Sequence, residues 1–115
     1  MTFSTNVSAA LAFTFVLGAM IPAPLRAGDE ASYALTIKDH KFEPRTLSIK
    51  AGVKAQISIH NDQKQAAEFE SGTLNREKII PPGGSAVVSV GPLTPGTYDF
   101  FDDFHRDTTG NVVVK

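Results

Sequence analysis

The stretch TLSIKAGVKAQISIH, residues 46–60, decides the fold class. Apolar and polar residues alternate in residues 46–50 and again in residues 53–60, with Ala51-Gly52 between them. Alternation with a period of two gives an extended chain one apolar and one polar face, and a glycine between two such runs is typical of a turn. The stretch therefore predicts two half-buried β-strands joined by a short connection.

The same pattern recurs along the rest of residues 28–115, and no segment shows a sustained helical period. Residues 32–38, 85–90 and 98–104 are short and rich in apolar residues, and residues 111–115 close the chain with NVVVK. The sequence PPGG at residues 81–84 interrupts the pattern, as turn residues do. About seven or eight short strands in one domain predict an all-β sandwich or barrel.

The N-terminal 27 residues differ from the rest. Residues 7–21, VSAALAFTFVLGAMI, carry no charge and are followed by prolines at positions 22 and 24. A helix that crosses a membrane needs about 20 apolar residues, so this run has the length of a secretory signal. We expect residues 1–27 to be a signal peptide cleaved after Ala27, leaving a domain of residues 28–115; an uncleaved anchor is the alternative.

Composition excludes several classes of protein. The chain has 115 residues, 11 Lys and Arg against 12 Asp and Glu, and no cysteine. A net charge of −1 provides no basic surface for nucleic acid. The absence of cysteine excludes a disulfide scaffold, an iron–sulfur site, a thiol nucleophile and a copper centre with a thiolate ligand.

Short motifs run through residues 32–115 in a fixed order. They are KFEP at 41–44, AG at 51–52, a strand that ends in Asn61, EFES at 68–71, PPGGS at 81–85, and PGTYDFF followed by DFH at 95–105. This order resembles the cupredoxin superfamily, and in particular the cupredoxin-like domain of EfeO-type proteins in bacterial periplasmic iron uptake. The resemblance implies a Greek-key β-sandwich of about eight strands.

The ligands of blue-copper members of that superfamily are replaced here. A blue-copper site uses two His, one Cys and a weak axial Met. The resemblance puts Glu68 near the first His position and Asp102 at the Cys position, while His105 keeps the second His. No Met follows, because residues 106–110 read RDTTG. The resemblance thus implies the cupredoxin frame without electron transfer of the plastocyanin kind.

The replacements are themselves metal ligands, but of a harder kind. Carboxylates with an imidazole suit Fe(II), Fe(III), Mn(II) or a non-blue Cu(II), and clustered carboxylates repel one another until a cation relieves them. An acidic residue at the end of a sandwich, taken singly, is usually just a solvated surface group. Together they predict a site for an iron or copper ion with these candidate ligands: Glu68, Asp102, His105, Glu70, Asp103 and His40.

The expected function follows from the resemblance and this ligand set. We expect a periplasmic metal-binding protein that supports an inner-membrane iron permease or another periplasmic iron-uptake component. Oxidation of Fe(II) would need an electron acceptor that the sequence does not display, so binding or delivery is expected and an enzymatic role stays open. The alternative is a metal-free β-sandwich that serves as an interaction module for a periplasmic or membrane partner.

Overall fold

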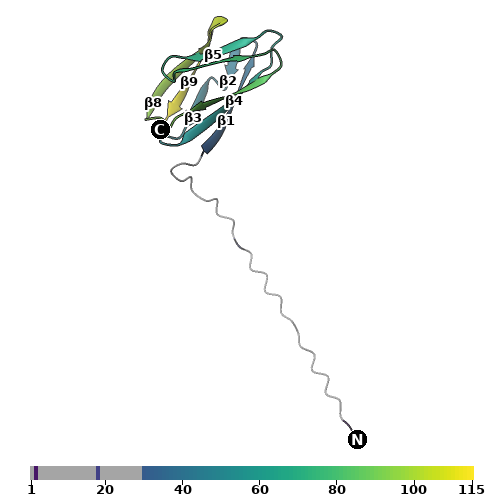
Figure 1. Cartoon of the computed structure of the whole chain (residues 1–115), viewed down its shortest axis with the longest axis vertical. Coiled ribbons are helices and arrows are strands. Elements are labelled where there is room, and N and C mark those ends of the chain that lie inside the picture. Colours follow the sequence, from purple (N-terminus) through teal and green to yellow (C-terminus); the bar gives the residue numbers. More distant parts are fainter. Residues whose placement is uncertain (1, 3–17, 19–29) are drawn as a thin grey trace.

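The computed structural model describes residues 2, 18 and 30–115, and the expected signal peptide lies outside these residues apart from two isolated positions. The described residues form nine strands and no helix (Figure 1). None of them belongs to a helix that is long and apolar enough to cross a membrane. The strands are β1 (Glu30–Lys38), β2 (Lys41–Glu43), β3 (Thr46–Ile49), β4 (Lys54–Asn61), β5 (Ala67–Ser71), β6 (Arg76–Ile80), β7 (Ser85–Val90), β8 (Gly96–Asp102) and β9 (His105–Val114).

The all-β prediction is confirmed, with one strand more than the expected seven or eight. The short strand β2 contains the KFE of the KFEP motif, where the sequence pattern shows no full alternation. The last strand begins at His105 rather than at residue 111, because β9 pairs with β8 along its length. Residues 105–110, which include Gly110, are therefore part of the sheet.

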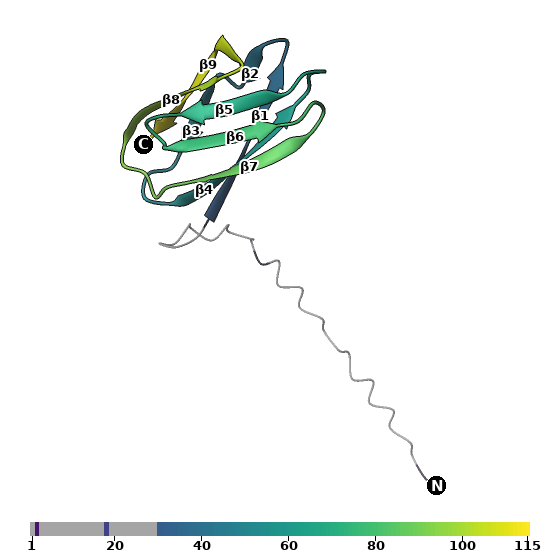
Figure 2. The same ribbon diagram turned by 45° about the horizontal axis from the view of Figure 1, so that its top comes forward.

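The strands form two sheets that pack face to face (Figure 2). One sheet has the order β2-β1-β4-β7 and the other β3-β9-β8-β5-β6. The chain changes sheet between β2 and β3, between β3 and β4, between β4 and β5, between β6 and β7, and between β7 and β8. These crossings place β5 beside β8, although about 30 residues separate them in the sequence.

The core lies between the sheets and contains the apolar members of the alternating runs. On β4 the residues Ala55, Ile57 and Ile59 are buried, while the polar residues between them lie on the outer face. Phe42, Phe69 and Phe100 bring β2, β5 and β8 together, with ring centroids 4.8 Å apart for Phe42–Phe100 and 5.0 Å for Phe69–Phe100. The rings fix which residues of β5 and β8 point inward.

Asn61 organises the loop that leads into β5. Its side chain is fully buried, and Nδ2 donates to the main-chain oxygens of Gln65 at 2.8 Å and Ile80 at 3.1 Å. Gln63 in turn donates to Asn61 Oδ1 at 3.1 Å. A buried amide satisfied in this way holds residues 61–66 in one conformation and places Gln65 at the end of the sandwich.

Candidate functional site: an acidic cluster beside a histidine pair

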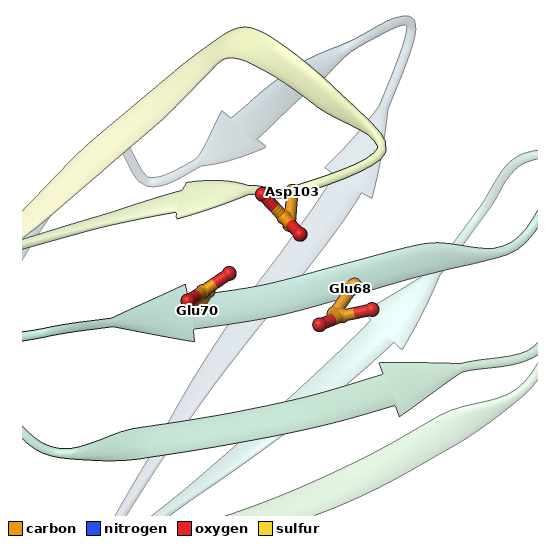
Figure 3. Close-up of side chains that lie close together, drawn as sticks. All are labelled: Glu68, Glu70 and Asp103. Atoms are coloured by element: carbon orange, nitrogen blue, oxygen red, sulfur yellow. The ribbon is translucent and has the colours of Figure 1, made fainter.

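Three carboxylates from two distant segments come together on the outer face of the second sheet. Phe69 points into the core, so Glu68 and Glu70 on either side of it point outward. Asp103 lies in the turn between β8 and β9 and points toward β5 (Figure 3). One carboxylate oxygen from each of these residues lies within 4.8 Å of the others. We call Glu68, Glu70 and Asp103 the acidic cluster.

Asp102 holds the turn that carries Asp103. Its side chain is fully buried on the inner face, and Oδ1 accepts hydrogen bonds from the main-chain N–H groups of Glu68 at 2.9 Å and Phe104 at 3.0 Å. The N–H of Asp103 donates to the main-chain oxygen of Glu68 at 2.8 Å. Asp102 therefore ties the turn to β5 and positions the cluster without belonging to it.

The electrostatics of the cluster are those of crowded carboxylates. A hydrogen bond with Glu77, loss of hydration, and the charges of Glu77, Asp103 and Glu70 raise the pKa of Glu68 from 4.5 to about 7. Loss of hydration, followed by the charges of Asp103 and Glu77, raises the pKa of Glu70, and Arg106 opposes this shift. Glu77 lies opposite Glu70 in the β5–β6 hairpin and is a fourth carboxylate at the site.

Arg106 supplies a positive charge at the edge of the acidic cluster. Its Nη2 lies 2.8 Å from Asp103 Oδ1, and its guanidinium carbon lies 5.6 Å from the centre of the Phe101 ring. The Arg106 side chain is 76% exposed and that of Asp103 28%. The pair is therefore a partly exposed ion pair, of a kind that contributes little to stability.

The two histidines of the predicted ligand set form a separate group. The rings of His40 and His105 have centroids 4.6 Å apart. The side-chain nitrogen of Gln65 lies 3.4 Å from His40 Nε2 and 3.5 Å from His105 Nε2. Asp102 Oδ2 lies 3.6 Å from His105 Nδ1, and both atoms are buried without a hydrogen-bond partner among the described residues.

The six residues expected from the sequence as one ligand set thus divide into two groups. Glu68, Glu70 and Asp103 lie together, whereas the inward-facing Asp102 and the two histidines are not in that cluster. Asp102 shares its face of β8 with the buried Phe100, two residues earlier, which is why its carboxylate points inward.

The sequence did not predict Glu77 and Arg106 at the acidic cluster or Gln65 at the histidine pair. The pairing of Ser71 with Arg76 at the closed end of the β5–β6 hairpin puts Glu77 opposite Glu70, so a predicted hairpin could have indicated its position. No feature of the local sequence indicates Gln65 as a site residue, because its position depends on the hydrogen bond between the buried Asn61 side chain and the main chain of Gln65.

The comparisons with known proteins agree with this architecture. A family model described as Cupredoxin-like domain matches residues 7–114. The chain belongs to the cupredoxin-like domain family. An uncharacterised protein of Rickettsia prowazekii is 42% identical over 80 residues, which are 70% of this chain and 64% of that protein. The iron uptake system component EfeO of Escherichia coli K12 is 32% identical over 94 residues, which are 77% of this chain and 24% of EfeO.

Cupredoxin-like structures show the same fold at low sequence identity. The Cu(I)-bound metal-binding domain of the exporting ATPase CopA from Streptococcus pneumoniae D39 has a TM-score of 0.65 and 18% identity, over 81% of this chain and 92% of that one. A purple cupredoxin from Nitrosopumilus maritimus has a TM-score of 0.59 and 18% identity, over 71% of this chain and 98% of that one. The cupredoxin-like chain matched here spans about two thirds of the Rickettsia protein and about a quarter of EfeO.

The donor set does not fit a blue-copper centre. The chain has no cysteine, and its two methionines, Met1 and Met20, precede the domain. One oxygen of the buried Asp102 carboxylate, Oδ1, accepts from two main-chain donors, and the other, Oδ2, lies 3.6 Å from His105 Nδ1. The side chains present suit a hard cation at the acidic cluster, and imidazole ligation at the histidine pair.

Proposed function

We propose that this cupredoxin-like protein binds iron at the acidic cluster of Glu68, Glu70 and Asp103, with Glu77 as an additional carboxylate. The observation that carries this proposal is the convergence of three carboxylate oxygens to within 4.8 Å of one another. Oxygen ligands with several negative charges suit Fe(II), Fe(III) and Mn(II). A bound cation would replace the mutual repulsion that raises the pKa of Glu68 with attraction.

The setting of the proposed activity is iron uptake in the periplasm. The support is the similarity to EfeO, a relative whose name describes an iron uptake component and of which this chain spans 24%. In this proposal the protein binds iron outside the inner membrane and delivers it to a permease or to another uptake component. The signal peptide expected over residues 1–27 belongs to the same proposal.

The histidine pair is proposed as a second place for a metal ion, with a preference for Cu(II). The supporting observation is the pair of buried unpartnered atoms, Asp102 Oδ2 and His105 Nδ1. A carboxylate beside one ring nitrogen orients the imidazole so that the other nitrogen can bind a metal. A metal ion bound by both His40 Nε2 and His105 Nε2 would have to displace the side-chain amide nitrogen of Gln65, which lies within 3.5 Å of both atoms.

Calorimetric titration of the purified protein tests these assignments. The titrants are Mn(II), Fe(II) without oxygen, and Cu(II), applied to the wild type, to a triple variant (Glu68→Gln, Glu70→Gln, Asp103→Asn), and to a double variant (His40→Gln, His105→Gln). We expect the triple variant to lose Fe(II) and Mn(II) binding while the double variant keeps it and loses Cu(II) binding.

Other outcomes of the titration reject parts of the proposal. If only the double variant lost Fe(II) binding, the iron site would have to be assigned to the histidine pair. No binding of any of the three metals by the wild type would reject a metal-binding function and favour the alternative of a metal-free interaction module.

A further inference from the structure

Arg106 is the feature of the acidic cluster that a simple cation site does not need. A divalent cation gains most from carboxylates that no other positive charge occupies, yet one carboxylate of the cluster already has an internal counter-ion. Arg106 Nη2 lies 2.8 Å from Asp103 Oδ1.

We propose that the guanidinium of Arg106 is an internal competitor of the metal ion, which must release Asp103 before the acidic cluster can bind a cation at full strength. This inference rests on the proposed function and adds to it a residue that sets cation affinity. It assigns to Arg106 no direct contact with the metal.

The geometry of the ion pair favours its release. The Asp103 Oδ1 atom is buried and makes no aligned hydrogen bond, although Arg106 Nη2 is within ion-pair distance. A carboxylate oxygen held by charge alone keeps lone pairs for a metal. The Arg106 side chain is 76% exposed, so it recovers hydration when it leaves, and the cost of breaking the pair is small.

The surface beside the acidic cluster has room for the released side chain. A groove of about 480 Å³ is lined by Phe101 and Arg106 together with Arg45, Thr109 and Asn111. Asp99 lines the same groove and offers the guanidinium another carboxylate. Arg106 therefore has an alternative position within the reach of its own side chain.

Arg45 provides a matched control for the charge change. It lines the same groove, is exposed, and its side chain lies 3.4 Å from Thr109 Oγ1, with no recorded contact to the acidic cluster. Arg45→Gln and Arg106→Gln remove one positive charge each, but only the second removes the partner of Asp103. A comparison of the two variants separates local competition from the change in net charge.

The test is calorimetric titration of wild type, Arg106→Gln, Arg106→Lys and Arg45→Gln with Mn(II) and with Fe(II) without oxygen. We expect Arg106→Gln to bind the metal about tenfold more tightly than wild type, and the metal affinity of Arg45→Gln to stay within about twofold of wild type. The reason is that salt screens the charge of a distant arginine more than that of one next to the acidic cluster. Arg106→Lys keeps the charge and should remain near wild type. The difference between Arg106→Gln and wild type should shrink when NaCl is raised, since the pair is partly exposed.

The competing explanation is that Arg106 holds Asp103 in the geometry the metal needs. In that case Arg106→Gln binds more weakly than wild type, and this result would overturn the inference while leaving the proposed function standing. Equal tightening in Arg106→Gln and Arg45→Gln would also overturn it, because the effect would then come from net charge. If neither wild type nor Arg106→Gln binds either metal, the proposed function itself fails and the inference fails with it.

Discussion

Asp102 provides the sharpest test of how the acidic cluster is built. In the structure Asp102 positions the β8–β9 turn, and a substitution should therefore act first on stability. Asp102→Ala removes the acceptor of the main-chain N–H groups of Glu68, at 2.9 Å, and of Phe104, at 3.0 Å. Asp102→Asn keeps an oxygen acceptor at that position, removes the charge and replaces Oδ2 with an amide NH2 group.

The magnitude follows from the two donors. Glu68 is 7% exposed, so its N–H loses the Asp102 acceptor in a place that water hardly reaches, at a cost of about 2 kcal/mol. Phe104 is 48% exposed, so its N–H can turn to water, at a cost of about 1 kcal/mol. The expected destabilisation of Asp102→Ala is thus about 3 kcal/mol, or about 12–24 °C in Tm for a domain of this size. Asp102→Asn should cost less than about 1 kcal/mol.

Urea denaturation followed by circular dichroism measures both variants against wild type in metal-free buffer. The reasoning is refuted if Asp102→Asn is as unstable as Asp102→Ala, because the carboxylate charge rather than the acceptor would then matter. A wild-type midpoint for Asp102→Ala would refute it as well. Titration of the folded Asp102→Asn protein with Mn(II) should leave binding at the acidic cluster intact.

Three further predictions concern the pH dependence and the core. Metal-free protein should lose stability as the pH rises from 4.5 to about 7, because the folded protein holds the Glu68 proton more tightly than the unfolded chain does. Glu68→Gln should flatten this part of a plot of urea midpoint against pH. Gly110→Ala should lower the free energy of unfolding by about 2–3 kcal/mol, because an added Cβ would lie 2.6 Å from the Phe100 ring and 2.7 Å from the main-chain oxygen of Arg45. An unchanged urea midpoint would contradict this. Phe100→Ala should lower the free energy of unfolding by about 3–5 kcal/mol, and Phe104→Ala by less than about 0.5 kcal/mol, because Phe100 is 1% and Phe104 48% exposed. Differential scanning calorimetry measures both, and equal losses would show that Phe100 does not organise the core.

The strands could be predicted because alternation is a local property. Runs such as residues 53–60 show their buried and exposed faces without reference to any other segment, and Ile57 and Ile59 are fully buried as that pattern indicates. The start of β9 at His105 could not be read in the same way. Residues 105–110 are mostly polar, and their extended conformation comes from pairing with β8.

The sequence could predict only in part that the six candidate ligands divide into the acidic cluster and the group of Asp102 with the two histidines. Alternation places Asp103 on the face opposite Asp102, and the pairing of Phe69 with Asp102 brings that turn next to β5. The inward position of Asp102 depends on Phe100 being the core residue of β8, which the neighbouring Phe101 made ambiguous. The core packing of Phe42, Phe69 and Phe100 resolves that ambiguity.

Local alternation and composition are enough to predict the all-β class, the absence of a thiolate ligand and the types of side chain available to a metal. The packing of the two sheets establishes that Glu68, Glu70 and Asp103 share one surface, that Arg106 reaches Asp103, and that His40 contacts His105. The acidic cluster arises where β5 lies beside β8, and the histidine pair arises where the turn between β1 and β2 meets the start of β9. Such long-range pairing is fixed by the burial of the whole core, which no short stretch of residues specifies.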